Sequence, residues 1–177
     1  MLIGGYSAGA HIGAMLAYNS ERDWLQECPM EDEQLSFRGF IGLAGIYDFS
    51  ATKLDSSFGP SICYLLSDVL DLEGLSIPAC TKEPDFDQWA EANPVDHVST
   101  GDPPALLVTG DKDCWLNLPD PETGLCISNT ERFATVLRDA GIRADVVVLP
   151  GVGRGPSGVL DTSDIGEALQ EFLEQVR

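Results

Sequence analysis

Histidine and lysine are both scarce in this sequence. The only histidines are His11 and His97, so the chain after residue 97 has none. Three of the ten basic residues are lysine, and 29 acidic residues leave a net charge of −19. A surface this acidic repels phosphate backbones and anionic lipid, so we expect neither a nucleic-acid nor a membrane partner. It suits a protein of a high-salt habitat and an ordinary acidic cytosolic protein equally well.

Long apolar runs are missing too. No stretch approaches the roughly 18 residues that a membrane-spanning helix requires. Met1 is followed by neither the basic segment nor the apolar stretch of a secretory signal peptide, so we expect a cytoplasmic protein. The 177 residues, 44% of them hydrophobic, suffice for one packed domain.

The sequence contains no C-x-x-C pair. Its five cysteines are widely spaced, which argues against a zinc site, and we expect no metal and no cofactor. Cys114 and Cys126 bracket a loop rich in proline and glycine and could bridge it, but the spacing favours buried free thiols. Residues 151–155 resemble a phosphate cradle. Because no helix pattern opens directly after them, nucleotide binding is not expected.

Strand and helix patterns alternate along the chain, which predicts a parallel sheet with right-handed crossovers. The first helix pattern has Ile12, Met15 and Leu16 at helical spacing. In the second, Ser128 and Glu131 form a capping box. Strands are expected at 2–5, 37–49, 103–110 and 144–151, helices at 8–18, 128–140 and 165–176, and irregular structure with short helical pieces at 50–100.

Ser7 lies at the turn between the first strand and the first helix, in the pentapeptide Gly5-Tyr6-Ser7-Ala8-Gly9. A Gly-x-Ser-x-Gly turn in this context lifts a nucleophilic serine hydroxyl above the sheet. The N–H of Ala8, at the start of the helix, is placed to donate to a developing oxyanion. The alternative is a serine that merely belongs to a glycine-rich turn.

Two further turns follow carboxyl ends of expected strands, where sites in parallel sheets lie. They contain Asp111 to Asp113 and Gly151 to Gly155. A carboxylate just past a strand end can orient an imidazole, and spacing favours Asp113 over Asp111. A turn-forming aspartate is the alternative for either residue.

The stretch "GGYSAGAHIGAMLA" resembles the nucleophile elbow of α/β-hydrolase esterases, including hormone-sensitive-lipase-like and kynurenine-formamidase-like carboxylesterases. The likeness continues through "FRGFIGLAGIYDF" and "PPALLVTGDKD" and reaches nearly to the end of the chain. It implies an α/β class and a partial α/β-hydrolase fold: about four parallel strands, flanking helices and a lid-like insertion at about 50–100. The family has about four strands before the elbow, so we expect residues 1–177 to form a single truncated domain.

Carried over by position, the resemblance implies that Ser7 is the nucleophile and Asp113 the acid. Arg154 stands where the family has its catalytic histidine, in Leu149-Pro150-Gly151-Val152-Gly153-Arg154-Gly155. A guanidinium has no free lone pair near neutral pH and cannot replace an imidazole base. His11 and His97 are not expected to act as the base, because neither lies where its side chain would reach the serine.

The resemblance implies a serine esterase for small carboxylic esters or amides. We expect it to be inactive or crippled, because Arg154 replaces the histidine and because the N-terminal half, which completes the oxyanion hole in the family, is missing from this sequence. Tyr6 and Trp115 are candidate binding residues, while packing is the expected role of Trp24 and Trp89. The alternatives are a non-catalytic ligand-binding or interaction protein, and a fragment without independent function. The expected partner is a small ester or amide. Self-association is also expected, through the exposed edge of the first strand.

Overall fold

A four-stranded sheet forms the centre of the fold in the computed structural model, which describes residues 1–19, 36–49, 90–114, 122–154 and 163–177. The strands lie in the order β1-β2-β3-β4, and every neighbouring pair is parallel. This confirms the predicted sheet, although β2 is shorter than expected. Their bounds are β1 Leu2–Tyr6, β2 Gly39–Leu43, β3 Ala105–Gly110 and β4 Ala144–Leu149.

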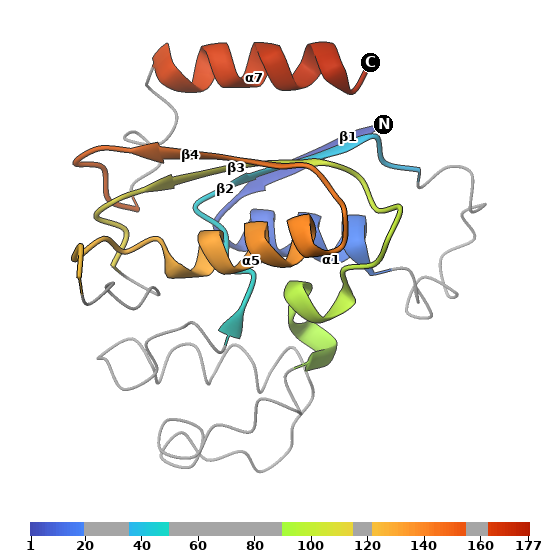
Figure 1. Ribbon diagram of the computed structural model, residues 1–177, viewed down its shortest axis with the longest axis horizontal. Coiled ribbons are helices and arrows are strands. Elements are labelled where there is room, and N and C mark those ends of the chain that lie inside the picture. The colour runs from blue at the N-terminus through green and yellow to red at the C-terminus, as the bar shows by residue number, and fades with distance from the viewer. Residues whose placement is uncertain (20–35, 50–89, 115–121, 155–162) are drawn as a thin grey trace.

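Helices cover both faces of the sheet (Figure 1). Helices α1 (Ala8–Tyr18) and α5 (Ser128–Asp139) lie on one face, and α7 (Ser163–Gln175) lies on the other. Two short 3-10 helices, η4 (Ala90–Ala92) and η5 (Pro94–His97), precede β3, and η5 packs beside α1 and α5. The remaining part of the expected lid-like segment, residues 50–89, lies outside the described residues.

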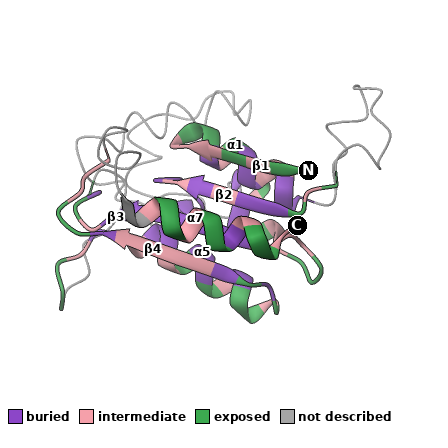
Figure 2. Cartoon of the chain, turned by 90° about the horizontal axis from the view of Figure 1, so that it is seen from above, coloured by how far each residue is buried: buried purple, intermediate pink, exposed green. Residues whose placement is uncertain are grey.

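Side chains of successive strand residues point to opposite faces, so the sheet contributes to two cores. Phe40 and Leu107 pack toward α1 and α5, whereas Leu106 and Val108 pack with Phe172 of α7. All six residues of β3 are buried. Figure 2 shows this gradient, with β3 and most of β2 buried and β4 largely half-buried.

The buried face of α1 differs from the one expected. Ile12 is 59% exposed, and the buried positions are occupied mainly by small residues. A Cβ on Gly13 would lie 3.2 Å from the ring of Phe40, so these small residues let the helix approach the sheet closely. The expected apolar face was wrong, because hydrophobic spacing does not reveal which face requires small side chains. The buried residues of α1 are Ala10, Gly13, Ala14, Ala17 and Tyr18.

Helix α5 begins one residue earlier than the capping box predicts. Ser128 is its first residue and Ile127 holds the N-cap position, where the Ile127 carbonyl accepts the N–H of Glu131 at 3.0 Å. The predicted end at Gly141 is confirmed, because that glycine has a φ of 78°. The Gly141 and Ile142 N–H groups donate to the carbonyls of Arg138 and Leu137, as in a Schellman motif.

Strands β1 and β4 are the edges of the described sheet. Leu2, at the start of β1, is 40% exposed. Within the described segments, no helix has the length and apolar character needed to cross a membrane.

Candidate active site

Ser7 occupies a sharp turn between β1 and α1, as the pentapeptide predicts. Its φ of 55° is rare for a residue with a side chain. The Ser7 N–H donates to the carbonyl of Leu43 at 2.8 Å, and the Ser7 carbonyl accepts N–H groups from Ala10 and His11. The backbone on both sides of Ser7 is therefore held while the half-buried side chain stands at the carboxyl end of the sheet.

Gly5 and Gly9 have different roles in this turn. A Cβ on Gly5 would lie 2.3 Å from the carbonyl carbon and oxygen of Gly9, which no real side chain tolerates. A Cβ on Gly9 would meet nothing within 4 Å. The first glycine of the pentapeptide is therefore required by packing, and the second is not required by any described residue.

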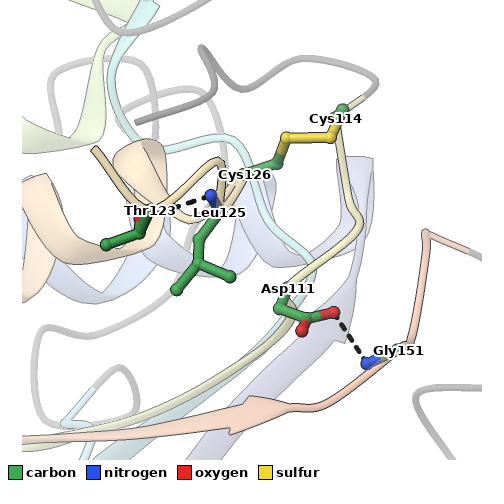
Figure 3. Close-up of a disulfide and its surroundings, with 6 residues drawn as sticks. All are labelled: Asp111, Cys114, Thr123, Leu125, Cys126 and Gly151. Atoms are coloured by element: carbon green, nitrogen blue, oxygen red, sulfur yellow. Dashed lines mark hydrogen bonds between the residues drawn. A yellow bond between two sulfur atoms is a disulfide. The ribbon is translucent and has the colours of Figure 1, made fainter. Parts of the chain in front are cut away.

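Residues 110–114, hereafter the acid turn, follow β3 and contain both candidate aspartates. The Oδ1 of Asp111 accepts a hydrogen bond from the N–H of Gly151 at 2.7 Å (Figure 3). The N–H of Lys112 donates to the carbonyl of Val152 at 2.9 Å. Asp113 is 2% exposed and points toward Arg154. The two aspartates thus have different partners. Asp111 binds the neighbouring turn, and Asp113 belongs to the cluster around Ser7.

A disulfide joins Cys114 to Cys126, with their Cα atoms 4.8 Å apart (Figure 3). The expectation of free thiols at these two positions was wrong, because the fold places the two cysteines next to each other although they are 12 residues apart in the sequence. The other three cysteines, Cys28, Cys63 and Cys80, lie outside the described residues.

Arg154 reaches between Ser7 and Asp113. Its Nη2 donates to Ser7 Oγ at 3.0 Å, and its Nη1 donates to Asp113 Oδ2 at 3.3 Å. The Arg154 side chain is 13% exposed and that of Asp113 1% exposed, so the ion pair is largely shielded from water. The Tyr6 hydroxyl donates to the Arg154 carbonyl and ties this residue to the end of β1.

A guanidinium in this position can donate hydrogen bonds and supply positive charge, but it cannot take a proton. Its N–H groups are all donors and it stays protonated in proteins. The Ser7 oxygen accepts the bond from Arg154. The arrangement therefore orients the serine without providing the base that nucleophilic attack requires.

Neither histidine takes part in this cluster. The Nδ1 of His11 lies 3.0 Å from the carbonyl oxygen of Ile46, so Nδ1 carries the proton of that hydrogen bond. Burial lowers the pKa of His11, and the bond to Ile46 offsets part of this effect. His97 Nε2 lies 2.9 Å from the carbonyl oxygen of Glu91, in the segment before β3.

Of the remaining candidates, Ala8 is exposed and is the first residue of α1. Its N–H therefore has no carbonyl partner within the helix. Trp115 lies outside the described residues. Within the described ranges, no group of three or more histidine, cysteine, aspartate or glutamate residues is arranged to hold a metal ion.

Sequence reasoning missed the contacts that hold the site together. The bond from Tyr6 to the Arg154 carbonyl and the bond from Asp111 to Gly151 join turns from different parts of the chain. Asp111 had one signal in the sequence, its place directly after a strand. Nothing in the spacing of Tyr6 indicated its partner.

A family model described as BD-FAE, an α/β-hydrolase-type esterase domain, matches residues 1–121. No curated protein is similar enough to this chain to match it.

Solved esterase structures share the fold. A truncated carbohydrate esterase from gut microbiota has a TM-score of 0.63 and 19% identity, covering 98% of this chain and 59% of that one. A thermophilic esterase from the Planctomycetes species Thermogutta terrifontis, bound to propionate, has a TM-score of 0.61 and 17% identity, covering 99% and 55%. The esterase 2 of that species, phosphoramylated by tabun, has a TM-score of 0.60 and 21% identity, covering 99% and 54%. This chain thus spans a little over half the length of these relatives.

Proposed function

Because this chain belongs to the BD-FAE family of α/β-hydrolase-type esterase domains, we propose that it carries the site of a serine esterase in which Arg154 prevents turnover. Ser7 takes the position of the nucleophile and Asp113 that of the acid. Ala8 provides one oxyanion donor. The observation that carries this proposal is the guanidinium of Arg154, which bonds to both Ser7 Oγ and Asp113 Oδ2.

The missing step is proton transfer. In a serine esterase, the hydroxyl oxygen attacks the acyl carbon while a base takes the hydroxyl proton, and the protonated base later gives that proton to the leaving group. Arg154 offers no lone pair for the first transfer. The Ser7 proton would have to pass to water, without the rate gain of about 10² to 10⁴ from a positioned base.

The proposed ligand is a small carboxylic ester or amide. The Thermogutta esterase structures bound to propionate and to butyrate support a site for short acyl groups. The structures in which esterase 2 is modified by tabun or paraoxon support a reactive serine in this fold.

A second candidate is a ligand-binding protein without catalysis. Arg154 favours it, because the same contacts that deny Ser7 a base create a largely buried, positively charged donor beside an exposed helix N-terminus. Such a site can hold the carbonyl of an ester without cleaving it. Ligand-dependent thermal stabilisation without product formation would favour this candidate.

Replacing Arg154 tests the proposal directly. Arg154→His should raise p-nitrophenyl acetate hydrolysis at least about 100-fold over the wild-type chain, because an imidazole restores the base. Arg154→Gln is the matched control: it keeps hydrogen-bond donors but no basic nitrogen, and should gain nothing.

Two further variants locate the chemistry. Adding Ser7→Ala to Arg154→His should abolish the gained activity. Hydrolysis by the wild-type chain that is lost in Ser7→Ala would refute the claim that Arg154 prevents turnover.

A further inference from the structure

We propose that the Cys114–Cys126 disulfide positions Asp113 against Arg154, and that reduction of this bond by a dithiol loosens the Ser7 site. The effect on a bound ligand rests on the proposed function, whereas the positioning of Asp113 is a statement about geometry alone. The chain is anchored on each side of Asp113, by the Asp111 carboxylate before it and by the disulfide after it; Figure 3 shows both anchors.

The anchor before Asp113 is Asp111. Its N–H donates to the carbonyl of Leu149 at 3.1 Å, and its carboxylate accepts the N–H of Gly151 at 2.7 Å. These bonds connect the start of the acid turn to the end of β4 and to the turn that leads to Arg154. Asp111 thus joins the acid turn to the turn that follows β4.

The anchor after Asp113 is the disulfide. Cys114 directly follows Asp113, and its sulfur is bonded to Cys126, which is fully buried and immediately precedes the N-cap of α5. The N–H of Cys126 also donates to the carbonyl of Asp111 at 3.1 Å. The disulfide therefore ties the far side of the acid turn to the core.

Without the disulfide, the far side of the turn is held more weakly. Among the described residues, the backbone of Cys114 makes one hydrogen bond. It is local, from the Cys114 N–H to the carbonyl of Lys112 at 2.8 Å. The N–H of Asp113 itself donates to the carbonyl of Gly110 at 3.2 Å, which ties Asp113 to the start of the acid turn but not to the core beyond it. A movement of the peptide after Asp113 would separate its carboxylate from Arg154, and Arg154 also contacts Ser7.

The two sulfurs differ in accessibility. Cys114 is exposed and Cys126 is fully buried, so a dithiol reductant would attack the sulfur of Cys114. The thiolate of the reductant forms a mixed disulfide with Cys114 and releases Cys126 as a thiolate. The second thiol of the reductant then displaces Cys114 and closes a disulfide in the reductant, which is oxidised by two electrons as the protein disulfide is reduced.

The test uses an imidazole as a reporter of Asp113. In the full chain with Cys28, Cys63 and Cys80 replaced by serine, Arg154→His places an imidazole beside the Asp113 carboxylate. Its pKa is measured by NMR titration before and after reduction with dithiothreitol. We expect the pKa to be lower by about 1 in the reduced protein, because the stabilising carboxylate has moved away.

The control adds Asp113→Asn to the same chain. The pKa of the introduced imidazole should then be the same in both redox states. No hydrolysis is measured, so a failure of the proposed function leaves this test intact.

Three outcomes would overturn the proposal. The first is an imidazole pKa that does not change on reduction while Asp113 is present. The second is a protein mass showing that Cys114 and Cys126 are free thiols after purification without reductant. The third is loss of amide-exchange protection in β3 on reduction, because the disulfide would then support the whole fold rather than one carboxylate.

Discussion

Arg154 differs from a histidine at this site in the property that proton transfer requires, a free lone pair. Both can donate to the Asp113 carboxylate, and both can contact the Ser7 oxygen. Only a neutral imidazole also presents a lone pair to the serine proton. The hydrogen bond between Arg154 and Ser7 therefore has the opposite direction, because Arg154 donates where a base would accept.

The turn around Ser7 depends on Gly5 in particular. Gly5→Ala should destabilise the fold by about 3 kcal/mol or more, because the new Cβ would overlap the Gly9 carbonyl. Gly9→Ala is the matched control and should be neutral or stabilising by up to about 1 kcal/mol, because the position is open and helical. Urea unfolding measures both. Equal destabilisation by the two substitutions would contradict the packing described for this turn.

His11 should make stability depend on pH. Its pKa is lowered in the folded chain by burial, so the unfolded chain binds the proton more readily. The free energy of unfolding should be fully retained at pH values above 6.5, the ordinary pKa of histidine. It should fall as the pH drops through that value.

His11→Asn keeps a donor for the Ile46 carbonyl but does not titrate. Its urea midpoint should therefore fall less than that of the wild-type chain between about pH 8 and about pH 5.5. Parallel pH profiles for the two proteins would rule out His11 as the source of the dependence.

At the scale of elements, α5 holds the chain after β2 in place. The Asn129 side chain accepts the N–H of Tyr47 at 2.6 Å and that of Asp48 at 3.1 Å, and it donates to the Asp48 carbonyl at 2.7 Å. Phe133, one turn further along α5, stacks on Tyr47 with ring centroids 4.5 Å apart. One helix thus fixes a segment that has no regular structure of its own.

Asn129→Ala should reduce the free energy of unfolding by roughly 2–4 kcal/mol. The amide is 1% exposed, and its loss would leave buried backbone groups without these hydrogen bonds. Thr135→Ala removes an exposed side-chain bond from the same helix and should change stability by less than about 0.5 kcal/mol. Chemical denaturation of both variants tests this. A loss below about 1 kcal/mol for Asn129→Ala would contradict it.

At the scale of the whole molecule, exposed apolar side chains and the net charge have opposite effects on the association of two copies. The large hydrophobic side chains that are exposed in the described residues, Met1, Leu2 and Ile12, all belong to the β1 and α1 region. We propose that this exposure favours pairing of two copies along the β1 edge. The net charge of −19 repels such copies at long range.

Self-association should therefore increase with salt. Between about 0.01 M and about 0.1 M NaCl the screening length falls from about 30 Å to about 10 Å, and light scattering should show a rising mean mass. Leu2→Lys should suppress the rise by placing a charge on the edge. A mass that is constant across the series, or unaffected by Leu2→Lys, would argue against association through β1.

The sheet could be predicted well from the sequence, because alternating apolar strands and amphipathic helices report burial along the chain. The buried face of α1 could not, since Ile12 fits helical spacing as well as Ala10 and Ala14 do. The N-cap of α5 was misassigned to Ser128 instead of Ile127, because Ser128 and Glu131 match a capping box whether or not the chain uses it.

The order of residues alone determined the Gly-x-Ser-x-Gly turn at Ser7, the aspartates that follow β3 and the arginine at position 154, which the family resemblance aligns with a histidine. These are local properties, set by residue type and by spacing of a few positions. The contact of Arg154 with both Ser7 and Asp113, the separation of Asp111 from Asp113 by role, and the pairing of Cys114 with Cys126 came from folding. Each depends on where distant segments meet in space, and one-dimensional spacing carries no such distance.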